Sequence, residues 1–153
     1  MKTLPLLFIL GAILSWGAYV PTIHHGQFAF VPKGPLRAFL FVGIAYFLVA
    51  VIVPGFVIYG VKAESATLTG RGVTLSLLAG LFGALGALCV IYALKTGGKP
   101  IYVAPLVFAG APIMNVIVTL IWEKKLAMPD WRFLLGIVLA AVGAALVLRF
   151  KPA

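Results

Sequence analysis

The sequence contains little charge and very few acidic residues. Only 10% of its 153 residues are charged, and just three are acidic: Glu64, Glu123 and Asp130. A single cysteine, Cys89, excludes an intrachain disulfide and a cysteine-based metal site. No nucleophile is paired with a base along the chain. We therefore predict that the protein is not an enzyme and that it binds neither metal nor cofactor.

Apolar residues, in contrast, are abundant. They make up 63% of the chain, and the mean hydropathy is +1.18. A soluble domain of this length cannot bury so much apolar surface, so the solvent must be lipid. The composition predicts an all-α integral membrane protein.

Five apolar runs are long enough to be membrane spans, since a hydrocarbon core of about 30 Å needs roughly 20 helical residues. Their short connections predict antiparallel neighbours in a five-transmembrane-helix bundle. Cys89, inside the third run, is expected to be buried. We predict one membrane domain, residues 1–153, with spans at about 4–20, 36–60, 73–94, 100–122 and 131–150.

The first run has two interpretations. Lys2, an apolar stretch and then small residues are also typical of a signal peptide. However, the run continues past Trp16 and contains no convincing Ala-x-Ala cleavage site. These features favour a retained span.

The net charge of +9 comes from twelve Lys and Arg at the ends of the apolar runs. That position is typical of contacts with lipid headgroups and disfavours nucleic-acid binding. With five spans, the two sides carry equal numbers of cations, so the positive-inside rule predicts no orientation. A dual-topology protein or a protein held by partners would both fit. The N-terminal side has Lys2, Lys62, Arg71, Lys124, Lys125 and Arg132; the other side has Lys33, Arg37, Lys95, Lys99, Arg149 and Lys151.

Small residues recur every four positions in the third and fifth runs. One ladder joins Ser76, Gly80 and Ala84, and another begins at Gly136. Such ladders let helix backbones approach closely in lipid. A compact bundle or a dimer is expected.

No ionisable residue lies near the middle of a span, which argues against a proton-coupled exporter built on a membrane glutamate. Glu123, at the end of the fourth run, is interpreted as an interfacial charge. The fourth run carries Pro105 and Pro112 on one helical face, with Asn115 at its edge. This face either lines a cavity or is bonded to a neighbouring helix. The candidate substrate-path residues are Trp16, Tyr19, Tyr46, Tyr92, Tyr102, Pro112, Asn115 and Thr119.

The longest connection, "PTIHHGQFAFVPKGP", contains His24 and His25. A tandem pair can bind metal or sense pH. Because no third ligand is near in the sequence, solvated loop histidines are favoured. The segment "KTGGK", Lys95 to Lys99, predicts a tight turn in which glycine supplies a positive φ.

Three stretches carry a family resemblance: "YALKTGGKPIYVAPLVFAGAPIMNVIVTLIWEKK", "LLGIVLAAVGAALVL" and "GAILSWGAYVPTIHHG". Through them, most of the chain resembles one repeat of the EamA-type transporters of the drug/metabolite transporter superfamily. Pro112 and Glu123 match family positions, as do Gly136 and Gly143. Members usually carry two such repeats of inverted topology around a substrate path, so the resemblance implies that two copies assemble.

Two functions follow as expectations. The first is an EamA-like transporter or facilitator of a neutral or zwitterionic small metabolite, working as a homodimer by alternating access in the bacterial cytoplasmic (inner) membrane. The second is a non-transporting structural or assembly subunit of a larger membrane complex, built on the same fold.

Overall fold

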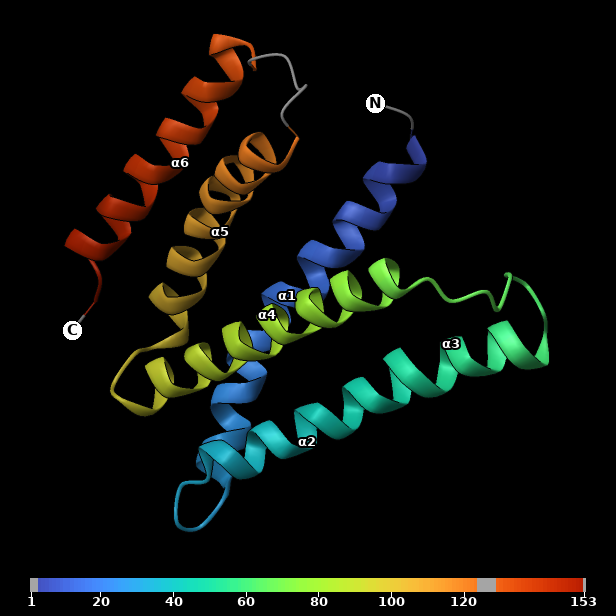
Figure 1. Ribbon diagram of the computed structural model, residues 1–153. Helices are drawn as coiled ribbons and strands as arrows, with labels where there is room; N and C mark the ends of the chain where they lie inside the picture. Colours follow the sequence, from blue (N-terminus) through green and yellow to red (C-terminus); the bar gives the residue numbers. More distant parts are fainter. Residues whose placement is uncertain (1–2, 124–128, 153) are drawn as a thin grey trace. The chain divides into compact units, whose positions relative to one another are not determined.

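The computed structural model describes residues 3–123 and 129–152, and all regular structure in these ranges is helical. The run from Pro35 to Gly60 is unbroken and contains two π-helical segments, η1 and η2. The elements in chain order (Figure 1) are α1 (Thr3–Ala29), α2 (Pro35–Phe47), η1 (Leu48–Ile52), α3 (Val53–Gly55), η2 (Phe56–Gly60), α4 (Gly70–Lys95), α5 (Pro100–Trp122) and α6 (Trp131–Arg149).

Within the described residues, five helices are long and apolar enough to cross a membrane, which confirms the predictions of helical structure and of five long apolar helices. They are Leu4–Ala29, Pro35–Gly60, Gly70–Lys95, Pro100–Trp122 and Trp131–Arg149. Three cations of the predicted charge balance, Lys2, Lys124 and Lys125, lie outside the described residues.

The first helix is longer than predicted. The sequence placed its end near Val20, but α1 continues through Pro21 to Ala29. A proline removes one backbone donor without preventing the next turn from forming, so Pro21 alone does not end the helix. The chain turns after Ala29, where the Gly34 N–H donates to the Gln27 carbonyl at 3.0 Å. His24 and His25 therefore lie on a helix and not in a loop.

The second helical run is π-helical on both sides of Pro54. Just before this proline the Val53 N–H donates to the carbonyl of Leu48, and after it the Val61 N–H donates to that of Phe56. Both bonds reach back five residues, which is the π-helical pattern. The backbone thus accommodates the missing proline N–H within a continuous helix.

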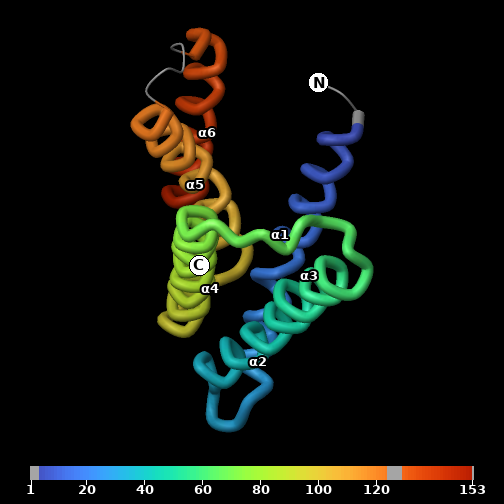
Figure 2. Tube along the Cα trace, turned by 45° about the vertical axis from the view of Figure 1, so that its right-hand side comes forward, coloured from blue at the N-terminus to red at the C-terminus, as the bar shows by residue number. Residues whose placement is uncertain are grey.

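By packing, the chain forms two compact units, Met1–Val20 with Gly97–Ala153 and Pro21–Thr96. In the first unit α5 packs against α6 in antiparallel fashion, and both views show them side by side (Figures 1 and 2). In the second unit α2 packs against α4, also antiparallel (Figure 1). The prediction of a single membrane domain stays a prediction.

Buried side chains of the second unit gather where α1 ends, α2 begins and α4 ends. Among the described residues these are Ile23, Gln27, Pro35, Ala38, Ala87, Val90, Ile91 and Leu94. Cys89, predicted to be buried, is exposed. It points away from the buried face of α4 because it lies two residues, or about 200°, from both Ala87 and Ile91.

Most large apolar side chains are exposed. Phe8, Phe82 and Ile121 are each at least 70% exposed, and no described residue of α6 is buried. So much exposed apolar surface needs a cover of lipid or of other helices.

Candidate functional site

The predicted substrate-path residues belong to both packing units. Tyr46 and Tyr92 lie in the second unit, and the other six lie in the first. Tyr46 is exposed on α2, and Tyr92 is exposed near the end of α4. The predicted path residues are thus divided between the two units.

A cavity of about 440 Å³ lies between the end of α5 and the start of α6. Of the predicted path it includes only Asn115 and Thr119. Tyr102 and Pro112, on the same helix, do not line it. The cavity is lined by Asn115, Val116, Thr119, Leu120, Pro129, Asp130 and Phe133.

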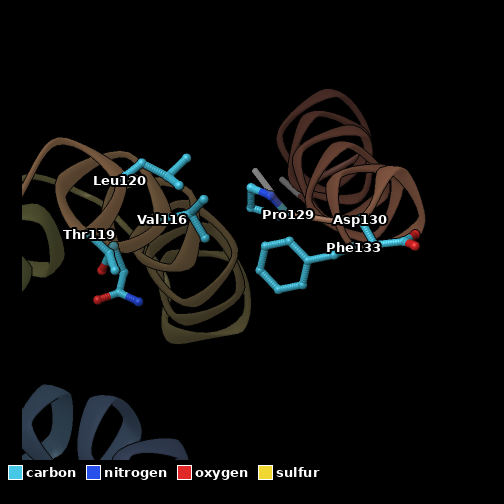
Figure 3. Close-up of a pocket in the computed structure, with 7 residues that line it drawn as sticks. Val116, Thr119, Leu120, Pro129, Asp130 and Phe133 are labelled. Atoms are coloured by element: carbon cyan, nitrogen blue, oxygen red, sulfur yellow. The ribbon is translucent and has the colours of Figure 1, made fainter. Parts of the chain in front are cut away.

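The centre of this cavity is apolar. Figure 3 shows Val116 and Leu120 on the side of α5 that faces Pro129 and Phe133. Thr119 points away from that centre, and so does the carboxylate of Asp130. The polar groups thus lie at the edges of the cavity.

Asp130 was not among the predicted site residues, and its position has a structural reason. Its Oδ1 accepts a hydrogen bond from the Arg132 N–H at 2.7 Å, so it caps the N-terminus of α6. A side-chain oxygen at this position satisfies a donor that has no partner within the helix. The aspartate directly before an apolar run was the sequence signal for this cap.

Asn115 is exposed on α5. Its side chain makes no hydrogen bond within the part of the chain that the structure describes. A neutral amide that carries two donors and an acceptor is costly to leave unpaired in an apolar medium. Asn115 can therefore bind either a polar solute or a partner helix.

The start of α5 carries structural contacts. The Tyr102 hydroxyl donates to the Gly97 carbonyl at 3.0 Å, and the Lys151 Nζ lies 5.2 Å from the centre of the Tyr102 ring. Gly97 has φ +105°, as the glycine-rich turn predicted. Tyr102 thus fixes the turn before α5.

Trp16 and Tyr19, three residues apart, lie on one face of α1. Their ring centres are 5.7 Å apart, in an edge-to-face arrangement. Trp16 also meets Phe108 of α5 at 6.2 Å, a partner that the sequence did not indicate. Such pairs add about 0.5–1.5 kcal/mol to the burial of their area.

The prolines leave α5 unbroken. Pro105 and Pro112 both lie inside the helix, and both are exposed. Each lacks the N–H that the carbonyl four residues earlier would otherwise accept within the helix. The prediction that this face lines a substrate path stays a prediction.

Glu123 lies at the C-terminal end of α5. It is exposed, and its backbone N–H donates to the Thr119 carbonyl at 2.8 Å. Glu123 is therefore an exposed charged residue at the end of a helix.

The end of α1 contains polar groups that the sequence did not single out. Gln27 is only 1% exposed, and neither its Nε2 nor its Oε1 has a hydrogen-bond partner among the described residues. The half-buried His24 lies on the same helix, 4.6 Å from the ring of Phe28, while His25 is exposed. Extending the helical period of Val20 and Ile23 beyond Pro21 would have placed Gln27 on the buried face.

No metal site accompanies these histidines within residues 3–123 and 129–152. There, no three His, Cys, Asp or Glu side chains are grouped so that they could hold a metal ion.

A second cavity, of about 260 Å³, lies in the other unit, and Tyr92 of the predicted path is part of its wall. We name it the basic pocket. It is lined by Lys33, Gly34, Pro35, Leu36, Arg37, Tyr92 and Lys95. The sequence showed these cations at the ends of separate apolar runs, but not that they share one cavity.

Comparison with known proteins assigns no family to this arrangement. No protein-family model matches the chain, and neither a curated protein nor a solved structure matches it.

Proposed function

We propose that the protein is a multi-pass membrane protein, of the bacterial cytoplasmic membrane, that moves a neutral or zwitterionic small metabolite across the bilayer. It works as a homodimer by alternating access. Its five long apolar helices support insertion into the membrane. The resemblance to a single EamA-type repeat supports the transport part of the proposal.

The exposed amide of Asn115 at the edge of the cavity between α5 and α6 carries this proposal. The volume of about 440 Å³ is in the range of small-molecule sites. An apolar wall with neutral polar groups at Asn115 and Thr119, and with the Asp130 carboxylate pointing away from the centre, suits a metabolite without net charge. Asn115 supplies both donors and an acceptor, which a zwitterion or a neutral polar solute can use.

Dimer formation is supported by helical glycines that have open space beside them. A Cβ added at Gly80 or Gly83 of α4, or at Gly136 or Gly143 of α6, would meet no atom within 4 Å. These positions leave room for the backbone of another helix. A second copy would also cover part of the exposed apolar surface.

Transport by reconstituted vesicles tests the proposal. Purified protein in vesicles should take up at least one member of a panel of neutral and zwitterionic metabolites. Asn115→Leu should reduce that uptake about five- to thirtyfold, because one lost hydrogen bond to a polar solute is worth about 1–2 kcal/mol. Met114→Leu, an exposed neighbour that does not line the cavity, is the matched control.

The outcome that contradicts transport is equally clear. If no solute of the panel moves, and Asn115→Leu leaves every cellular phenotype unchanged, the transport proposal fails.

A structural or assembly subunit of a larger membrane complex is the second candidate. The apolar centre of the cavity favours it, because Val116, Leu120 and Phe133 form a surface on which an apolar partner helix can pack (Figure 3). Purification in mild detergent separates the two candidates. A homodimer supports the transporter, whereas foreign subunits in fixed stoichiometry support the subunit.

A further inference from the structure

The basic pocket concentrates positive charge at one end of the second unit. Three of its seven lining residues are cations: Lys33 in the turn before α2, Arg37 in the first turn of α2 and Lys95 in the last turn of α4. Residues from two antiparallel helices therefore bring three like charges around about 260 Å³.

The two lysines are held near aromatic rings. The Lys33 Nζ lies 4.3 Å from the centre of the Phe28 ring, and the Lys95 Nζ lies 5.2 Å from that of Tyr92. Both distances are within the range of cation–π attraction. An ammonium group above a ring face still has N–H donors free for an anion.

Arg37 is positioned by two contacts. Its guanidinium lies 4.8 Å from the centre of the Phe30 ring, which stacks on Phe41 at 6.1 Å, and its Nη2 donates to the Pro32 carbonyl. These contacts occupy one edge and one face of the planar group. The remaining donors keep the fork geometry that binds phosphate oxygens.

No carboxylate neutralises these cations within the described parts of the chain. Glu64 is the only acidic residue of the second unit, and it precedes α4, whereas Lys95 ends that helix. Lys33, Arg37 and Lys95 form no ion pair with any described residue. Three uncompensated charges repel one another, and a bound anion removes that repulsion.

The backbone adds to this charge. α2 begins at the pocket, and the N–H groups of its first turn have no acceptor within the helix. The turn itself is fixed, because the Gly34 N–H donates to the carbonyl of Gln27 at 3.0 Å. The cations and the helix start are thus presented to one ligand.

We propose that the basic pocket binds a phosphate group, either in the headgroup of an anionic phospholipid or as a free phosphate anion. Its position fits a headgroup. The 27 residues of α1 span about 40 Å at about 1.5 Å each, so its last turns extend beyond a hydrocarbon core of about 30 Å. Basic pockets between helices at this level bind anionic headgroups. The inference rests on the membrane insertion in the proposed function, and not on transport.

Ligand-dependent thermal stability of the full chain in mild detergent tests this site. The probes are short-chain phosphatidylglycerol, short-chain phosphatidylcholine and inorganic phosphate at constant ionic strength. Phosphatidylglycerol should raise Tm saturably, and phosphatidylcholine should not, because its choline neutralises the phosphate. If inorganic phosphate competes with phosphatidylglycerol, the site binds the free anion. If it does not compete, the site binds the lipid headgroup.

Charge-removing variants locate the effect. Arg37→Gln and Lys95→Gln should each raise the apparent Kd for phosphatidylglycerol at least about tenfold, because each removes a charge-assisted hydrogen bond to the phosphate. Arg71→Gln, which removes an exposed cation from the first turn of α4, should leave Kd unchanged. If Arg37→Gln does not fold, Lys95→Gln gives the answer alone.

Three results would each contradict the proposed site. They are equal stabilisation by both lipids, no change in Tm with any probe, and a rise in Kd in Arg71→Gln as large as in Lys95→Gln. Binding in detergent requires neither transport nor a homodimer. A protein that moves no solute yet shows the Lys95-dependent shift loses the transport proposal and keeps this one.

Discussion

The Tyr102 hydroxyl donates a hydrogen bond to the carbonyl of Gly97, 3.0 Å away. This bond ties the first turn of α5 to the glycine at which the chain reverses after α4. Gly97 has φ +105°, a conformation that side chains with a Cβ rarely adopt. A hydroxyl and a glycine together determine where α5 begins.

Removing the hydroxyl should weaken this turn. Tyr102→Phe keeps the ring below Lys151 and loses only the bond to Gly97, so we expect a loss of about 0.5–1.5 kcal/mol in stability. Thermal unfolding in detergent, followed by circular dichroism, measures the change. Tyr59→Phe is the control, because Tyr59 is exposed and its hydroxyl bonds no described residue. Equal shifts in both variants would contradict the structural role of Tyr102.

The positive φ at Gly97 gives a second prediction. Gly97→Ala should destabilise the protein by about 1–3 kcal/mol through backbone strain, although no atom lies within 4 Å of the added Cβ. Gly11→Ala, in the open part of α1, should instead be neutral or stabilising by up to about 1 kcal/mol. The same unfolding experiment distinguishes them, and a Gly97→Ala protein as stable as Gly11→Ala would rule out strain at the turn.

The cap of α6 can be tested through Asp130. Asp130→Ala removes the oxygen that bonds the Arg132 N–H and should cost about 0.5–2 kcal/mol. Asp130→Asn keeps an oxygen in the same place and should stay within a few tenths of a kcal/mol of the parent protein. Chemical denaturation in detergent gives both values. If Asp130→Asn lost as much stability as Asp130→Ala, the charge of Asp130, and not its capping hydrogen bond, would matter at this site.

The small-residue surface of α6 predicts the behaviour of the dimer. Gly136→Leu introduces a side chain that meets nothing in the isolated chain, so folding should persist while close helix contact is lost. Cross-linking and light scattering in detergent should show a dimer for the parent and a monomer for the variant. Gly11→Leu, also in open space on another helix, should remain dimeric. A Gly136→Leu dimer of unchanged strength would place the interface elsewhere.

The number and type of helices could be predicted because span length and hydropathy are properties of the local sequence. The pairing of Trp16 with Tyr19 was predictable for the same reason, since residues three apart meet on a helix. The predicted first span ends at residue 20, whereas α1 continues through Pro21 to Ala29, because one proline inside a helix removes only one backbone donor.

Burial and site composition depend on contacts between distant segments. Gln27 is buried and Cys89 exposed, although neither fact follows from the hydropathy of the surrounding residues. Of the predicted path on α5, only Asn115 and Thr119 line the cavity, because the start of α6 supplies its other wall.

The sequence by itself determined the five helices of the described residues that are long and apolar enough to cross a membrane, because each needs only its own length of apolar residues and its own backbone hydrogen bonds. Only the tertiary structure decided that Lys33 and Arg37 share a pocket with Lys95. The antiparallel packing of α2 and α4 brings together cations that lie far apart along the chain, and no local pattern encodes that approach.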